Sequence, residues 1–218
     1  MGLDMDPAKI ISLILVFVGC AVMFWIILKF TSEKIVKQYR VLSERFGLEL
    51  EQPSPQMGGF IRAEPSAYGV YREREISFSA PGKGLKGSRQ TESVLKLELK
   101  DRKLRGQISV SGLLGLGQRG HGGQARWQSG DEAFDATVDL RTDHDDVFAE
   151  VLTDERRQQL ATILKASKAM LYIAKGTMAY AEVGLIANDT TRQRFEEMVE
   201  FLCDFAEAVE SRNLGKDD

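Results

Sequence analysis

The longest apolar stretch of the chain lies close to its amino terminus. From Ile10 to Leu28 the sequence carries no charge, and Lys9 and Lys29 flank this run. At a rise of about 1.5 Å per residue, a helix of this length crosses the hydrocarbon layer of a bilayer, which is about 30 Å thick. A helix also satisfies its own backbone polar groups in lipid. The pattern predicts a transmembrane helix over residues 10–30, after a short tail of residues 1–9.

We interpret this helix as a retained anchor, because the acidic residues Asp4 and Asp6 stand where a signal peptide has a basic region. Its orientation follows from the basic residues beside it. Those that follow the run are Lys29, Lys34, Lys37, Arg40 and Arg45, against Lys9 and the terminal amine on the other side. The positive-inside rule therefore predicts a single-pass protein of the inner (cytoplasmic) membrane, with its amino terminus outside and its carboxyl-terminal domain in the cytoplasm. Cys203 agrees, because no second cysteine of the soluble part can pair with it.

A second helix pattern follows the anchor directly. Ile35, Tyr39, Leu42 and Phe46 are spaced by four, three and four residues, which predicts an amphipathic juxtamembrane helix over residues 31–47. Such a stripe either docks on the protein's own domain, forms a rigid stalk, or dimerises as a short coiled coil. The proline- and glycine-containing residues 48–59 then indicate a linker.

The remaining residues, 60–213, alternate between two periodicities. Period-two patterns predict strands over residues 67–71, 76–80, 95–99, 108–110 and 134–141, and a hairpin over 170–174 and 178–185. Helical patterns predict a short helix capped by Asp143, a helix over 153–167 that begins at Thr153, and a final helix over 190–211. This order predicts an α+β domain in which a mostly antiparallel sheet packs with three or four helices.

Part of this domain resembles a known group of proteins. The resemblance rests on Gly130–Asp135, Asp143, Val151–Thr153 and Leu171–Ile173, which give a Phe-Asp strand, an acidic turn and a Leu-Thr helix start. This pattern is similar to the carboxyl-terminal part of bacterial single-span membrane proteins of uncharacterised function. The resemblance implies membrane association and a similar local fold, and it implies no catalytic residue.

Three segments suggest specific chemistry, and we assign none to any of them. Gly115–Gly120 matches a dinucleotide-binding fingerprint, but no helix pattern follows it to receive a pyrophosphate. Gly82–Arg89 lacks the lysine of a phosphate-binding loop. Asp143–Asp146 could supply metal ligands, but capping of a helix explains these acids. The sequence therefore predicts no catalytic residue, metal or cofactor, and it favours a protein that is not an enzyme. A membrane-bound enzyme whose site assembles around His121 or His144 remains the rival hypothesis.

The charge is strongly divided along the chain. Residues 59–130 carry 13 Lys and Arg against 6 Asp and Glu, whereas residues 131–218 carry 10 against 20. One interpretation is that the two halves attract each other within one fold. The other is that the basic half faces anionic lipid headgroups or a protein partner. The residues we predict for that surface are Arg72, Lys83, Lys86, Arg89, Arg102, Lys103 and Arg105.

These observations lead to a functional hypothesis. We expect a membrane-tethered cytoplasmic binding or scaffold domain whose partners are the lipid bilayer and an unidentified protein. Nucleic acid is not expected as a partner, because no aromatic-basic motif accompanies the charge. A subunit that dimerises through the juxtamembrane helix is a further alternative.

Overall fold

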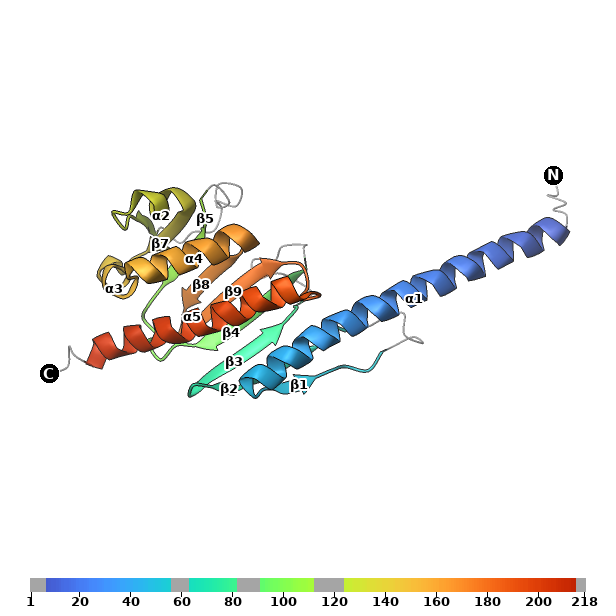
Figure 1. Ribbon diagram of the computed structural model, residues 1–218, viewed down its shortest axis with the longest axis horizontal. Coiled ribbons are helices and arrows are strands. Elements are labelled where there is room, and N and C mark those ends of the chain that lie inside the picture. Colours follow the sequence, from blue (N-terminus) through green and yellow to red (C-terminus); the bar gives the residue numbers. More distant parts are fainter. Residues whose placement is uncertain (1–6, 56–62, 82–90, 112–123, 215–218) are drawn as a thin grey trace.

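The structure is a computed structural model, and it describes residues 7–55, 63–81, 91–111 and 124–214. Figure 1 shows one long helix that projects from a domain built on a single sheet. The helices are α1 (Pro7–Phe46), α2 (Glu132–Thr137), α3 (Asp145–Val151), α4 (Asp154–Ser167) and α5 (Asp189–Leu214). The strands are β1 (Glu49–Glu51), β2 (Ser66–Tyr71), β3 (Arg74–Ser79), β4 (Glu92–Glu98), β5 (Gly106–Val110), β6 (Ala125–Trp127), β7 (Val138–Thr142), β8 (Met170–Ala174) and β9 (Thr177–Val183).

The strands form one antiparallel sheet in the order β1-β2-β3-β4-β9-β8-β5-β7-β6. Long helices cover one face of this sheet, where α1 packs on β2, α5 on β4 and α4 on β5 (Figure 1). Side chains alternate between the two faces along each strand. On β4, for example, Leu95 and Leu97 are buried in the core beneath the helices, whereas Lys96 is exposed on the other face. The predicted α+β fold with a mostly antiparallel sheet is confirmed.

Helix α1 is one unbroken element that contains both helices predicted for this region. Its last three turns carry the stripe Ile35, Tyr39, Leu42 and Phe46, and all four side chains are buried in the core of the domain. The stripe therefore docks on the protein's own domain, and it is not available for a coiled coil in this arrangement. Part of the predicted linker is also a strand. Glu49–Glu51 forms an edge strand that pairs with β2.

The strand predicted over residues 134–141 is wrong in its first half, where the chain forms α2. The side chain of Asp131 accepts hydrogen bonds from the backbone N–H groups of Ala133 and Phe134, and it thereby caps this helix. Phe134 and Val138 are four residues apart, a spacing that suits one face of a helix as well as alternation in a strand. The apolar pattern therefore fitted both a strand and a helix, and the cap at Asp131 favours the helix.

The boundaries of other helices and strands agree more closely with the prediction from the sequence. Thr153 caps α4 by accepting a hydrogen bond from the N–H of Arg156, as predicted. The predicted hairpin of β8 and β9 turns at Lys175 and Gly176. Asp143 does not cap α3, however. His144 occupies the cap position without a side-chain hydrogen bond, and its own N–H donates to the hydroxyl of Thr142.

Candidate functional site

Helix α1 changes its environment within two turns. Among the described residues, it alone is a helix long and apolar enough to cross a membrane. Large apolar side chains such as Leu15, which is 66% exposed, surround its first half, whereas Leu42 in its second half is 0% exposed. The apolar run ends at Lys29 and the first core residue is Ile35, about 9 Å further along the helix axis. A bilayer around the first half would therefore lie directly beside the domain.

A cluster of polar side chains connects α1 to α5 through hydrogen bonds and ion pairs. Gln38 on α1 donates to Asp189 over 3.2 Å and accepts from the Nε of Arg192 over 3.0 Å. Glu196 on α5 is buried and forms ion pairs with Arg192 and with Arg45 of α1. Because buried charges are tolerated only when they are paired, these contacts fix how α1 lies on the domain. Helix α1 is thus an integral element of the fold.

The sheet face opposite the helices carries a groove of about 820 Å³ over β2, β3, β4 and the start of β9. We call it the open-face groove. The side chains that strand alternation and register place on this face are Tyr68, Val70, Glu75, Ser77, Lys96, Glu98 and Thr177. Lys100, Arg102 and Lys175 lie at one end of the groove. The groove therefore combines exposed apolar groups with charges of both signs.

Two side chains of the open-face groove are unusual for a domain surface. Tyr68 is 45% exposed and Val70 is 64% exposed, and together with Val183 they are the exposed large apolar residues of the domain as far as the structure describes it. Tyr68 and Val70 are two residues apart on β2, so both point away from the helices. Exposed apolar groups that gather on one face, with polar groups around them, are typical of an interaction site.

The charge division found in the sequence is partly internal to the fold. Arg72, on the turn between β2 and β3, donates to Asp204 and Glu207 of α5, each over 2.8 Å. Arg74 forms a bidentate pair with Glu210 of α5, with Nη–Oε distances of 2.6 and 2.8 Å. These pairs join a basic strand region to the acidic carboxyl-terminal helix, which supports the interpretation that the two halves attract each other.

The pKa values of two groups on α5 are shifted by this environment. Burial alone would raise the pKa of Glu210, but the hydrogen bonds from Arg74 and from the backbone N–H of Lys100 lower it overall. Burial raises the pKa of the Cys203 thiol to about 11. Cys203 is therefore a buried thiol, and it lacks the thiolate character of a nucleophile.

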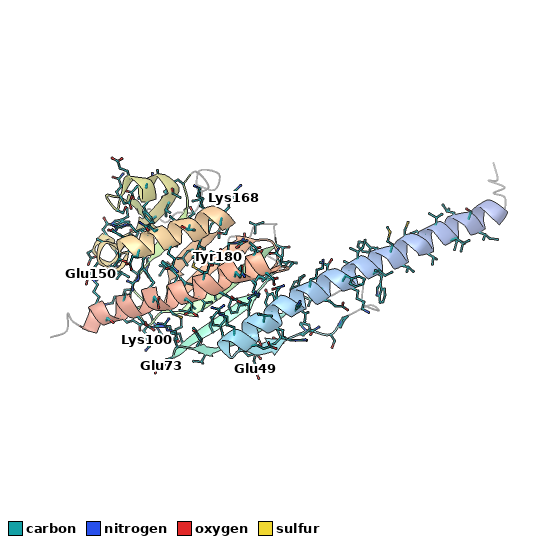
Figure 2. The ribbon with its side chains drawn as sticks, viewed as in Figure 1. Glu49, Glu73, Lys100, Glu150, Lys168 and Tyr180 are labelled. Atoms are coloured by element: carbon teal, nitrogen blue, oxygen red, sulfur yellow. The ribbon has the colours of Figure 1, made fainter. Side chains whose placement is uncertain are left out.

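The described members of the predicted basic surface lie at several places in the domain. Arg72 faces the acids of α5, Arg102 lies at the open-face groove, and Arg105 lines a separate hollow beside Tyr172. The backbone N–H of Lys103 donates to Asp101. Figure 2 shows Glu73 and Lys100, which neighbour this group in sequence, at the end of the sheet away from the projecting part of α1. Lys83, Lys86 and Arg89 lie outside the described residues.

The structure describes only part of the candidate chemical sites. His144 is half-buried at the start of α3, and His121 and the segment 115–120 lie outside the described residues. Within the described ranges, no group of three His, Cys, Asp or Glu residues is placed to hold a metal ion. Trp127 is buried against Phe148 in the core.

The fold is similar to that of a protein of known structure. No protein-family model matches the sequence, and a comparison with curated proteins finds no match. Among solved structures, the chain is similar to the crystal structure of the mycobacterial trehalose monomycolate transport factor A, TtfA, with a TM-score of 0.52 and 10% sequence identity. The match covers 80% of this chain and 94% of that protein. At this identity the similarity establishes a common fold.

Proposed function

We propose that the protein is a membrane-tethered, non-catalytic binding domain that holds a protein partner in its open-face groove, close to the bilayer. Helix α1 carries this proposal, because its first half is suited to lipid and its second half is part of the domain core. An unbroken helix keeps the domain at a fixed height and orientation above the membrane. That arrangement suits a factor that positions another component of the membrane.

The flanking charges and the shared fold add to this proposal. The basic residues after the apolar run support a position of the domain on the cytoplasmic side of the inner membrane. The protein that shares the fold is named as a transport factor for trehalose monomycolate. We propose by analogy that this chain serves as an accessory factor in a membrane transport process. Its cargo is not specified by the fold.

The composition of the open-face groove favours a protein as the partner. Tyr68 supplies a large aromatic contact, which is the residue type enriched at protein interfaces, and Val70 extends the apolar patch. Lys96 and Glu75 lie beside them on neighbouring strands and supply charges of opposite sign. Such a mixed surface selects its partner through complementary charge around an apolar centre.

Site-specific photo-crosslinking tests this function. A photoreactive amino acid at Val70 of the full chain, expressed in its own cells, should give a discrete cross-linked protein of higher mass. The same group at Glu150, an exposed residue of α3 (Figure 2), is the matched control and should not give that product. If Val70 gives no product, or if both positions give the same products, the open-face groove does not hold the partner.

A further inference from the structure

A second hollow lies beside α1, where the helix leaves the predicted membrane layer. It has a volume of about 280 Å³ and is bounded by α1 on one side and by Gln52 on the other. Figure 1 shows that the segment after β1 runs back along α1 toward the amino-terminal end of the helix. The residues that line this juxtamembrane hollow are Ser32, Glu33, Val36, Lys37, Arg40 and Gln52. It is distinct from the open-face groove.

The membrane end of the hollow lies at the height of lipid headgroups. Ser32 is about 4.5 Å beyond Lys29 along the helix axis, and Lys37 is about 12 Å beyond it. The headgroup layer is about 5–8 Å deep on each side of the hydrocarbon core. In an α-helix every Cα–Cβ bond tilts toward the amino terminus, which here is the membrane end. The long side chains of Lys37 and Arg40 therefore extend back toward the headgroups.

The basic side chains of the hollow, Lys37 and Arg40, are available for an anion, and the carboxylate of Glu33 lines the hollow beside them. Lys29, on the same side of the helix, forms an ion pair with Glu33 at 4.0 Å and lies over the ring of Trp25 at 5.7 Å. Within the part of the chain that the structure describes, neither Lys37 nor Arg40 forms an ion pair. Both side chains are exposed, and the buried Val36 lies one turn before Arg40 on the same side of the helix.

We infer that this hollow binds the phosphodiester headgroup of an anionic phospholipid, an inference that rests on the proposed membrane tethering. The guanidinium of Arg40 can bind two phosphate oxygens at once, and Lys37 adds a second positive charge. The hydroxyl of Ser32 and the amide of Gln52 are further hydrogen-bond donors at the rim. The acyl chains would lie along the exposed apolar half of α1. The bound lipid would then connect the bilayer to both α1 and the segment after β1.

Native mass spectrometry of the full chain released from detergent micelles measures this binding directly. With phosphatidylglycerol as the probe, Lys37→Gln and Arg40→Gln should each reduce lipid retention about tenfold, because each removes a charge-assisted hydrogen bond. Lys34→Gln is the matched control. Lys34 is exposed and one turn nearer to the bilayer, but it does not line the hollow. Zwitterionic phosphatidylcholine should be retained less than phosphatidylglycerol.

Three results would overturn the inference. Equal losses for Lys34→Gln and Lys37→Gln would indicate general attraction to an anionic surface, which is strongest nearest the membrane. Unchanged retention in both hollow variants would show that the lipid binds elsewhere. Displacement of phosphatidylglycerol by excess inorganic phosphate would indicate a site for a soluble anion. Cross-linking at Val70 does not depend on Lys37 or Arg40, so failure of this site and failure of the proposed function are separable.

Discussion

Replacing Leu42 by alanine should lower the free energy of unfolding of the domain by about 2–5 kcal/mol. Leu42 is fully buried where α1 packs on the sheet, so the truncation removes apolar contacts and leaves a cavity. The measurement is urea denaturation of the full chain in mild detergent, followed by the fluorescence of the buried Trp127. A Trp25→Phe background removes the signal of the other tryptophan, which lies in the apolar half of α1.

The same substitution at Leu15 is the matched control for this experiment. Leu15 belongs to the same helix but is exposed on its apolar half, so Leu15→Ala should change the free energy of unfolding by less than about 0.5 kcal/mol. Similar small effects at both positions would mean that the carboxyl-terminal part of α1 is a stalk that does not pack in the domain core. That outcome would contradict the role of α1 as a core element.

Replacing Arg74 by methionine should destabilise the domain by about 3 kcal/mol. The side chain of Arg74 is 4% exposed and that of Glu210 is 17% exposed, so the variant leaves a carboxylate with little solvent. Its remaining contacts among the described residues are the backbone N–H of Lys100 and the Lys100 ammonium at 4.0 Å. Removing one member of a buried ion pair typically costs about 3–5 kcal/mol, and the partial exposure of Glu210 favours the lower end. The same urea titration measures the change in free energy.

The double variant Arg74→Met with Glu210→Met provides the control, and it should recover most of the lost stability. Two apolar side chains of similar volume leave no buried charge. The Nε of Arg74 is buried without a hydrogen-bond partner among the described residues, so its removal sacrifices no further bond. A double variant as unstable as Arg74→Met would show that packing of the guanidinium, and not its charge, stabilises this position.

This pair also predicts how stability depends on pH. The pKa of Glu210 is lower in the folded protein than in the unfolded chain. Its contribution is therefore fully present above the unfolded pKa of about 4.3 and is lost as the pH falls through the lower folded value. The protein with Arg74 and Glu210 should lose stability over this acidic range more steeply than the double variant, which lacks the titrating group.

Much of the fold was readable from the sequence because its signals are local. The apolar run, the four-three-four spacing of Ile35 to Phe46 and the cap at Thr153 each depend on a few neighbouring residues. The first half of residues 134–141 was not predictable in this way, because its apolar spacing fits both a strand and a helix. The edge strand β1 was also missed, since three residues are too few to show a period.

The candidate sites depend on residues far apart in the chain. Tyr68 and Lys96 reach the same groove only through the register of three adjacent strands, which no local pattern specifies. Gln38 and Asp189 are 151 positions apart, yet they form one hydrogen bond. Period-two alternation did indicate that Tyr68 and Val70 share a face. Their exposure became evident only when the helices were found on the opposite face.

The distance between two spin labels on α1 in a reconstituted bilayer tests the central claim, that one rigid helix extends from the membrane into the domain core. Val22 and Glu44 are both exposed, and Cys20→Ser leaves the buried Cys203 as the remaining native thiol. Electron–electron double resonance should give a narrow distribution centred near about 33 Å, the length of 22 helical residues. A broad distribution at shorter distances would mean that the helix breaks between the membrane and the domain, and the account would then be wrong.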